Sequence, residues 1–292
     1  MLVKCSLYNW KMQLFNGKEY ARKLDVKITE FLKHNNLTKK LLIIQIGDNA
    51  ESQKYINLKK KVCERLGVLI QVEYFSSGLS DELIHQNIND LVNNDIVGGV
   101  IIQLPLPRQS LQKVLDLIPH NKDVDLLSSI NLAQFYGGNF QKLPPVVRAI
   151  KYFMEVNEID TQNMTAVVIG AGELVGRPLS FFLAQQGLKV EVLDKKINYD
   201  KVYAPGINIK GDVLISAAGV PNLVKGEDIS AGCHVIDFGS SVLNGKTVGD
   251  IDIGSKLDHL GIFSPSPGGM GPLVVRFLII NFLEFVVGKK IV

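Results

Sequence analysis

A glycine-rich segment in the second half of the chain has the spacing expected of a dinucleotide site. Gly170, Gly172 and Gly176 follow an apolar run at residues 166–169 and precede a helical pattern. Glycines in such a turn let the backbone approach a pyrophosphate, and the helix N-terminus beyond it supplies free N–H groups and a positive dipole. This order of strand, turn and helix therefore predicts a nicotinamide cofactor. The residues expected to contact it are Gly170, Ala171, Gly172, Glu173, Val175, Gly176, Ala218 and Gly219.

The type of cofactor depends on Asp194, which ends the next predicted strand. A carboxylate at this position accepts hydrogen bonds from the ribose hydroxyls of NAD and repels the 2′-phosphate of NADP. Two other interpretations stay open: Asp194 could simply end a strand at the surface, and the adjacent Lys195 and Lys196 could bind a phosphate. The sequence favours NAD.

A second group of polar residues lies on one predicted helix in the first half of the chain. Ser52, Tyr55 and Lys59 are spaced i, i+3 and i+7, so they share one helix face. On the evidence of the helix alone, Tyr55 is more simply the edge of a core and Lys59 one of several solvated lysines. The function of this face therefore depends on the segments around it.

Alternating strands and helices must position both groups of residues. Apolar strands are predicted at 41–46, 69–75, 98–104, 166–169, 190–193, 213–215 and 235–238. Amphipathic helices are predicted at 17–35, 51–66, 81–92, 146–156, 175–186 and 273–287. This alternation predicts an α/β protein with two doubly wound domains, the second a Rossmann-type dinucleotide-binding domain.

A polar stretch at residues 120–143 interrupts the alternation, which suits a site loop followed by a link between domains. We therefore place the first domain at residues 1–147 together with the C-terminal helix 273–292. The dinucleotide-binding domain is placed at residues 148–272.

The composition indicates a globular protein rather than a disordered one. Hydrophobic residues make up 46% of the 292 residues and charged residues 21%. The net charge of +3, from 32 basic and 29 acidic residues, does not suggest nucleic acid as a partner. Cys5, Cys63 and Cys233 are scattered and form no CxxC pair, so we expect neither disulfides nor a metal site, as in a reducing cytoplasm.

No segment is expected to cross a membrane. Residues 1–14 lack the uninterrupted apolar run of a signal peptide. The most apolar stretch, residues 272–287, contains Arg276, Asn281 and Glu284, so we expect a buried helix there.

Five ordered blocks resemble the bifunctional methylenetetrahydrofolate dehydrogenase/cyclohydrolase family, and together they span nearly the whole chain. The helix that contains Lys59 resembles the SQxYxxxKxK segment of that family. The other blocks are GGVIIQLPLP at 98–107, KDVD at 122–125 followed by Asn131, VGDID at 248–252, and SPSPGGMGP at 264–272.

This resemblance implies oxidation of 5,10-methylenetetrahydrofolate with NAD or NADP, followed by hydrolysis of the methenyl product to 10-formyltetrahydrofolate. Lys59 matches the family's acid/base lysine, a role that suits it if burial and a cationic substrate lower its pKa. Tyr55 would pack on the folate, Gln103 would hydrogen-bond Lys59, and Asp125 would accept from the pterin. Further substrate contacts are expected at Ser52, Pro267, Gly268 and Gly269. The resemblance also implies a homodimer joined through the dinucleotide domains.

The chain departs from the family pattern at three places. Ala171 and Gly172 replace an Arg and a Ser that contribute to the NADP 2′-phosphate site, which together with Asp194 points to NAD. Pro145 and Val146 replace a Cys and a Thr at the start of the inter-domain helix. Leu126 replaces the glycine that usually follows KDVD, so the loop of Asp125 could differ in shape.

Three alternatives to the bifunctional enzyme stay open. A dehydrogenase without the hydrolytic step is disfavoured because Tyr55, Lys59 and Gln103 are all retained. A two-domain NAD(P) dehydrogenase of the shikimate type would have no evident reason for the PGGxGP block. A folate- or nucleotide-binding protein without activity finds no support in an intact Lys59.

Overall fold

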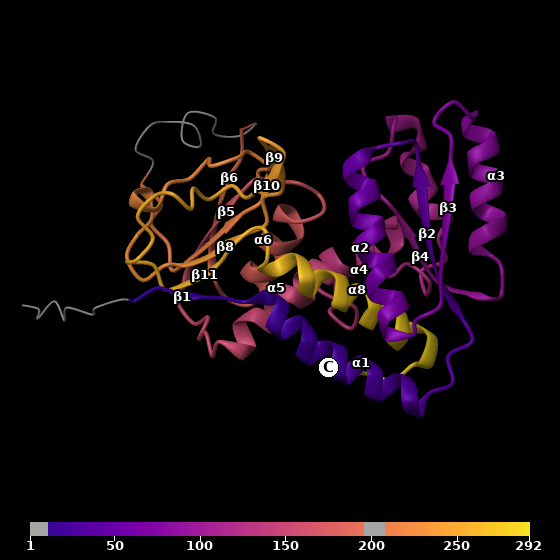
Figure 1. Cartoon of the computed structure of the whole chain (residues 1–292), viewed down its shortest axis with the longest axis horizontal. Helices are drawn as coiled ribbons and strands as arrows, with labels where there is room; N and C mark the ends of the chain where they lie inside the picture. The colour runs from indigo at the N-terminus through magenta and orange to yellow at the C-terminus, as the bar shows by residue number, and fades with distance from the viewer. Residues whose placement is uncertain (1–10, 196–207) are drawn as a thin grey trace, which may run out of the picture. The chain divides into compact units, whose positions relative to one another are not determined.

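The computed structural model describes residues 11–195 and 208–292, which form two compact units (Figure 1). The first, here called the lysine unit, comprises Ala21–Arg148 and Val275–Val292. The second, the glycine-turn unit, comprises Ala149–Val274 and the described residues up to Tyr20.

A three-stranded parallel sheet forms the centre of the lysine unit. Its order is β3 (Ile70–Phe75), β2 (Lys40–Ile46) and β4 (Val97–Ile102). Leu42, Ile44 and Ile46 point to one face, where α3 (Asp81–Val92) and the 3-10 helix η1 (Gln109–Leu117) cover them. Figure 1 shows α2 (Ala50–Leu66) on the opposite side of the sheet from α3. Because β2 is flanked by β3 and β4, the chain reverses its direction of winding between β2 and β4.

The helix α8 (Met270–Val287) packs closely against this sheet because two glycines of β4 make room for it. A Cβ on Gly99 would lie 2.6 Å from Phe282, and one on Gly98 would lie 2.6 Å from Val286. By length and composition alone α8 could cross a membrane, but 67% of its apolar window is buried. Its buried Arg276 pairs with Asp25 of α1 (Gly17–His34) at 2.9 Å, as expected of a core helix.

Local signals in the sequence set the ends of α2. The Asn49 side chain accepts a hydrogen bond from Ser52 N at 2.8 Å, which caps the first turn. Gly67 ends the helix in the left-handed conformation with φ 77°, where glycine has no steric penalty. The helix therefore has fixed ends on either side of Lys59.

A six-stranded parallel sheet forms the centre of the glycine-turn unit. Its strands are, in order, β1 (Gln13–Leu14), β11 (Ile262–Ser264), β8 (His234–Asp237), β7 (Val213–Ser216), β5 (Thr165–Ile169) and β6 (Lys189–Leu193). The direction of winding reverses between β5 and β7, and ligands bind at such a switch point in open α/β sheets. The glycine turn directly follows β5 and leads into α6 (Gly176–Gln185).

Several elements differ from the sequence prediction. Residues 120–143 contain the helix α4 (Ser129–Tyr136), so only part of this stretch is a loop. The sequence did not predict β1, β11 or the antiparallel hairpin of β9 (Ser241–Leu243) and β10 (Lys246–Val248). The N-terminal segment was placed in the first domain, whereas β1 pairs with β11 in the glycine-turn unit.

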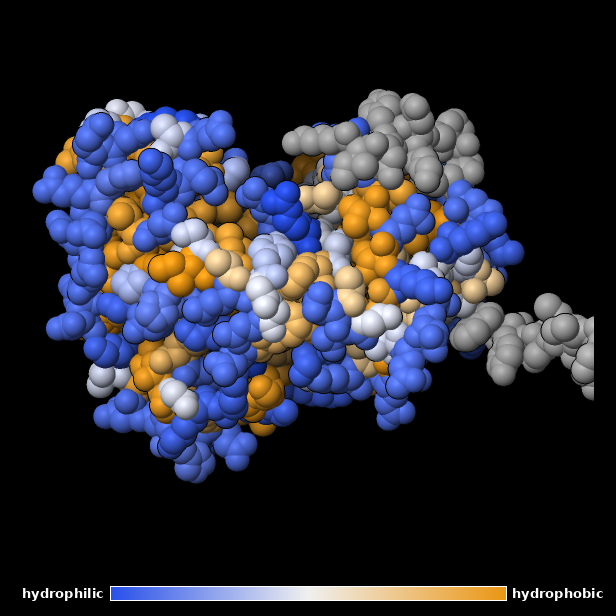
Figure 2. Space-filling model, turned by 180° about the vertical axis from the view of Figure 1, so that it is seen from behind, coloured by the Kyte–Doolittle hydropathy of each residue, from blue (hydrophilic) through white to orange (hydrophobic). Residues whose placement is uncertain are grey.

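Another helix, α5 (Pro145–Val156), starts at the proline that replaces a cysteine of the family pattern. Proline is well tolerated in the first helical turn, where its missing N–H has no partner to lose. On the face of the molecule in Figure 2, hydrophilic side chains surround smaller apolar areas. That mixture is ordinary for domains whose large apolar side chains are buried.

Candidate active site and cofactor site

The ammonium group of Lys59 and the side-chain amide of Gln103 meet at the carboxyl end of the sheet in the lysine unit. Lys59 Nζ donates to Gln103 Oε1 at 3.1 Å. Gln103 directly follows β4, and Lys59 lies on α2, the helix that follows β2. The contact therefore forms where the winding of this sheet reverses, which is where ligands bind in open α/β sheets.

A second set of hydrogen bonds fixes the orientation of the Gln103 amide. Gln103 Nε2 donates to Leu104 O at 2.8 Å, so its oxygen is the atom left to face Lys59. Ser52 Oγ donates to the same carbonyl at 3.2 Å, and Ser52 is only 3% exposed. The hydroxyl predicted to bind substrate thus ties α2 to the end of β4.

Burial and charge determine the protonation of Lys59 and Asp125. Burial lowers the pKa of Lys59, and the nearby Asp125 carboxylate opposes that shift by raising it. Burial raises the pKa of Asp125, while Lys59 lowers it and Asp123 raises it. Because its pKa is lowered overall, Lys59 is neutral more often near neutral pH than an ordinary lysine, and the neutral amine is the form that acts as a base. Cys63 lies one turn further along α2, and burial raises the pKa of its thiol to about 12, so it stays protonated.

The loop of Asp125 is shaped by its neighbour Asp123, which is 1% exposed. The Asp123 carboxylate accepts from Ser128 N at 2.8 Å, Ser128 Oγ at 2.7 Å and Asn131 Nδ2 at 2.9 Å. Leu126 adopts a positive φ of 58°, a conformation that favours glycine. The leucine therefore adopts a backbone conformation that glycine would adopt without a steric cost, while its side chain is 2% exposed.

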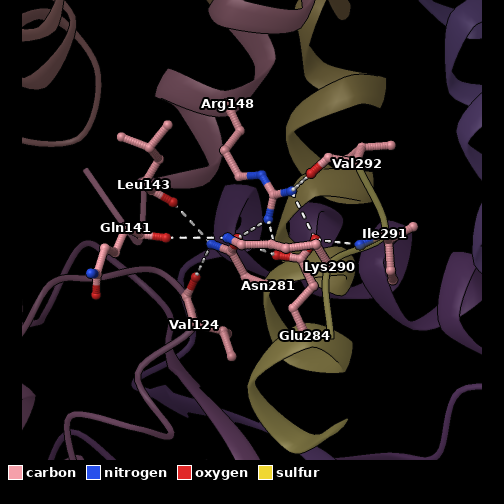
Figure 3. A network of polar contacts seen from close by, with 9 residues as sticks. All are labelled: Val124, Gln141, Leu143, Arg148, Asn281, Glu284, Lys290, Ile291 and Val292. Atoms are coloured by element: carbon pink, nitrogen blue, oxygen red, sulfur yellow. Dashed lines mark hydrogen bonds and ion pairs between the residues drawn. The ribbon is translucent and has the colours of Figure 1, made fainter. Parts of the chain in front are cut away.

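A buried polar network holds the other side of this loop (Figure 3). Asn281 Nδ2 of α8 donates to Val124 O at 2.9 Å and to Leu143 O at 3.1 Å. Arg148 donates to Asn281 Oδ1 at 2.7 Å and forms an ion pair with Glu284 at 2.8 Å. Val124, the residue before Asp125, is thus anchored to α8 directly and to α5 through Asn281.

Tyr55 and the turn at 267–269 complete the predicted substrate residues. Tyr55 is 43% exposed on α2, so much of its ring is open to a ligand. Pro267, Gly268 and Gly269 belong to the glycine-turn unit, just before α8. Gly268 has a φ of 110°, and a Cβ on Gly269 would lie 2.2 Å from Ser264 Oγ, so this turn requires glycine at both places.

The glycine turn after β5 has the geometry of a dinucleotide site. Gly170 has a φ of 91°, and a Cβ on Gly176 would lie 1.7 Å from Gly170 O, so the turn and the helix could not close with larger residues. A Cβ on Gly172 would meet no atom within 4 Å, so the space beside it is open. No side chain caps the N-terminus of α6, although Arg177 N donates to Gly172 O at 3.0 Å. These residues fit a pyrophosphate.

The carboxylate of Asp194 lies beside this turn. Asp194 Oδ2 accepts from Ala171 N at 2.9 Å, so it supports the backbone of the turn. Lys195 is exposed, and Lys196 lies outside the described residues. Glu173 is exposed and lies 4.0 Å from Arg177, while Val175 precedes α6 as its N-cap.

Ala218 and Gly219 follow β7, the strand next to β5. Both are partly or fully exposed at the carboxyl edge of the sheet, as a cofactor contact requires. Among the described residues, no group of three or more His, Cys, Asp or Glu could hold a metal ion.

Sequence reasoning missed two residues near the Lys59 site. Gln45 lies on β2 opposite Gln103 in the continuing register, and its buried Oε1 has no partner in the described part of the chain. Asn281 was treated only as an interruption of an apolar helix. A buried amide in an otherwise apolar strand or helix was the available signal in both cases.

Two family models match the chain, one in each half. The catalytic domain of tetrahydrofolate dehydrogenase/cyclohydrolase matches residues 15–125, and the NAD(P)-binding domain of the same family matches residues 144–290. The bifunctional protein FolD of Hydrogenobaculum sp. is 33% identical over 280 residues, which cover 94% of this chain and 98% of that protein.

Solved structures of such enzymes have the same fold. FolD from Campylobacter jejuni has a TM-score of 0.86 and 31% identity, covering 95% of this chain and 99% of its own. The methylenetetrahydrofolate dehydrogenase-cyclohydrolase of Trypanosoma brucei, solved with NADP and an inhibitor, has a TM-score of 0.85 and 25% identity, covering 95% and 98%.

Proposed function

Because the chain belongs to the tetrahydrofolate dehydrogenase/cyclohydrolase family, we propose that Lys59 and its neighbours form one folate site for both of the family's reactions. The protein oxidises 5,10-methylenetetrahydrofolate to 5,10-methenyltetrahydrofolate, with NAD or NADP as the hydride acceptor, and hydrolyses the product to 10-formyltetrahydrofolate. The observation that carries the site assignment is the 3.1 Å contact between Lys59 Nζ and Gln103 Oε1.

In the hydrolytic step, the neutral amine of Lys59 acts as the base. It accepts a proton from the water that adds to the methenyl carbon, and the resulting ammonium returns that proton to N5 as the bond between N5 and this carbon breaks. The added hydroxyl loses its remaining proton to solvent in the same step and becomes the formyl carbonyl, so one proton is released for each cation hydrolysed. The lowered pKa of Lys59 supports this role, because an ordinary lysine would be protonated at neutral pH. Gln103 holds the amine in place, since its own amide is fixed by Leu104 O.

The other residues bind and orient the folate. Asp125 accepts from the amino group and ring N–H of the pterin, and the loop anchored by Asp123 and Asn281 fixes its position. Tyr55 packs on the folate with its exposed ring. Ser52 contributes through Leu104 O, and the 267–269 turn offers backbone to the ligand.

For the cofactor, we propose NAD rather than NADP. Gly172 leaves open space where the family usually has a serine, and Ala171 provides no cation for a 2′-phosphate. The Asp194 carboxylate, held beside the turn by Ala171 N, would repel that phosphate and accept from the ribose hydroxyls of NAD. The proposal also includes a cytoplasmic location and a homodimer. Sedimentation of the purified chain would test the homodimer.

Steady-state reduction of NAD and of NADP, with methylenetetrahydrofolate as donor, tests the cofactor proposal. We expect kcat/KM to be at least about tenfold higher with NAD, which corresponds to a single unfavourable charge contact. Equal or higher efficiency with NADP would overturn the role given to Asp194, Ala171 and Gly172. Hydrolysis of methenyltetrahydrofolate, followed in the same samples, tests the second activity without any cofactor.

The dehydrogenase-only and shikimate-type alternatives find no support in the comparisons. Both halves of the chain match folate enzymes with the two activities. The lysine and glutamine needed for hydrolysis are in contact.

A further inference from the structure

A buried carboxylate in the glycine-turn unit, Asp250, gathers the hydrogen-bond donors of one loop. Asp250 Oδ2 accepts from Ser216 Oγ at 2.8 Å, from Ala218 N at 2.8 Å and from Gly219 N at 3.3 Å. Its Oδ1 accepts from Val220 N at 2.9 Å. Consecutive backbone N–H groups that converge in this way form an anion-binding nest, and here the chain's own carboxylate fills it.

The loop held by Asp250 packs directly against the glycine turn. A Cβ on Gly170 would lie 2.5 Å from Ala217 O and 3.0 Å from Ala218 N, so the two segments are in close contact. Ala217 N also donates to Ile169 O at 2.8 Å. A shift of the loop would therefore move or crowd the turn that follows β5.

Asp250 is itself held in place by a second carboxylate, Asp237, at the end of β8. Asp237 accepts from Asp250 N at 3.1 Å, Ile251 N at 3.0 Å and Gly239 N at 2.7 Å. A Cβ on Gly239 would lie 2.2 Å from Asp250 Oδ1, so the carboxylate occupies space that only a glycine at this position leaves open. Burial raises the pKa of Asp237 to about 7, although its hydrogen bonds from backbone N–H groups lower it.

We propose that Asp250 is a positioning residue for the dinucleotide site, because it sets the shape of the Ala218–Gly219 loop and through it the glycine turn. This inference rests on the proposed contact of Ala218 and Gly219 with the cofactor. Asp250 acts on the cofactor only through these backbone segments. It has no part in the hydrolytic step, which needs no dinucleotide.

The test is Asp250→Asn in the full chain. The amide keeps the size of the side chain but replaces one acceptor oxygen with an N–H donor, which then faces a backbone N–H. We expect the KM for the dinucleotide to rise about tenfold or more, because buried N–H groups of the loop lose their acceptor. Hydrolysis of methenyltetrahydrofolate should stay within about twofold of the original rate, which a general loss of folding would not allow.

Asp212→Asn is the matched control. Asp212 Oδ2 also accepts from a backbone N–H, Thr165 N at 2.7 Å, but at the amino end of β5 and away from the predicted site. The control should leave the KM for the dinucleotide unchanged. Equal effects of the two substitutions would overturn the inference, as would a parallel loss of hydrolysis in Asp250→Asn.

Ala218→Leu tests separately whether the Ala218–Gly219 loop contacts the cofactor, on which the role of Asp250 depends. If Ala218→Leu raises the KM for the dinucleotide and Asp250→Asn does not, the loop contacts the cofactor and the role of Asp250 is wrong. If neither substitution changes it, the loop assignment fails and the inference with it. A rise of the KM for the dinucleotide in both variants supports the inference.

Discussion

Lys59 Nζ and Gln103 Oε1 lie 3.1 Å apart, which links α2 to the end of β4 across 44 positions of sequence. The bond from Gln103 Nε2 to Leu104 O orients the amide so that its oxygen, the acceptor, is directed towards Lys59. The position of the amine is thus fixed by hydrogen bonds, whereas its protonation is governed by burial and Asp125. Because position and protonation depend on different groups, substitutions of Lys59 and of Asp125 should have different effects.

Removal of the Lys59 amine should reduce the rate of hydrolysis far more than the rate of oxidation. We expect Lys59→Met to slow the hydrolysis of methenyltetrahydrofolate by about 10²–10⁴-fold, the usual contribution of an acid/base group, while some dehydrogenase activity remains. Stopped-flow or steady-state absorbance of the methenyl compound measures the loss. Lys60→Met is the control, because Lys60 is exposed and pairs only loosely with Glu64 at 3.8 Å. Hydrolysis at the original rate in Lys59→Met would refute the assigned role.

The pH dependence of hydrolysis should report the pKa of Lys59. If the neutral amine is the base, the rate rises as the pH increases through that pKa, which lies below the ordinary value for lysine. Asp125 raises the pKa of Lys59, so Asp125→Asn should move the rising limb to lower pH, even though weaker pterin binding reduces the rate. The limb is measured from kcat across the pH range at saturating substrate. A limb that stays in place, or moves to higher pH, would contradict the proposed coupling.

Much of the fold was predictable because its signals are local. The apolar run that became β2, the asparagine and glycine at the ends of α2, and Ser80, which caps α3 by accepting from Leu83 N at 3.3 Å, are all visible in short windows of sequence. The short strands β1 and β11 were not predicted, because two or three residues give no periodic pattern. They form only because each pairs with a strand distant in sequence.

The site was only partly predictable for a similar reason. The type and spacing of Lys59 and Gln103 are evident in the sequence, but the bonds from Ser52 and Gln103 to Leu104 O are not. Nor does the sequence indicate that Asp194 accepts from Ala171 N. Such contacts join a side chain to a backbone atom, and any residue could provide the backbone partner.

Substitution of Asp194 should change the preference between cofactors. Asp194→Ser removes the negative charge, so we expect the ratio of kcat/KM for NAD to that for NADP to fall about tenfold or more. Part of the loss with NAD would come from the turn, since Ala171 N loses a charged acceptor. The comparison is made with both cofactors on one preparation. Asp228→Ser is the control, since Asp228 lies in the 3-10 helix η2 (Gly226–Asp228) of the same unit and also accepts from a backbone N–H, Lys225 N at 3.3 Å. An unchanged ratio would show that Asp194 supports the turn without selecting the cofactor.

The buried ion pair of Arg148 should contribute far more to stability than an exposed pair on the same helix. Arg148→Met leaves the Glu284 carboxylate and Asn281 without their partner, which we expect to lower the free energy of unfolding by about 3–5 kcal/mol. Lys151→Met breaks the exposed pair with Glu155 and should cost about 0.5 kcal/mol or less. Chemical denaturation of both variants measures the difference. Similar losses in the two would mean that the network in Figure 3 contributes little.

The Arg148 pair should also make stability depend on pH. Burial raises the pKa of Glu284, but its hydrogen bonds and charge contact with Arg148 outweigh this and lower the pKa overall. Because the pKa in the folded state is lowered, the pair stabilises the protein above the unfolded pKa of glutamate, and this contribution is lost as the pH falls through the folded value. The gap in stability between the original chain and Arg148→Met should therefore narrow in acid. A gap that is constant with pH would contradict this.

The positive φ of Leu126 predicts an unusual order of stability among substitutions in the Asp125 loop. Both Leu126→Ala and Leu126→Gly lose a side chain that is 2% exposed, which should cost about 2–5 kcal/mol. Alanine keeps the steric cost of φ 58°, about 1–2 kcal/mol, whereas glycine does not. We therefore expect the glycine variant to be more stable than the alanine variant by about 1 kcal/mol. At the buried Leu111 of η1 the order should be the ordinary one, with alanine the more stable. Denaturant midpoints of the four variants measure both orders, and a more stable alanine at position 126 would show that the loop relaxes away from this conformation.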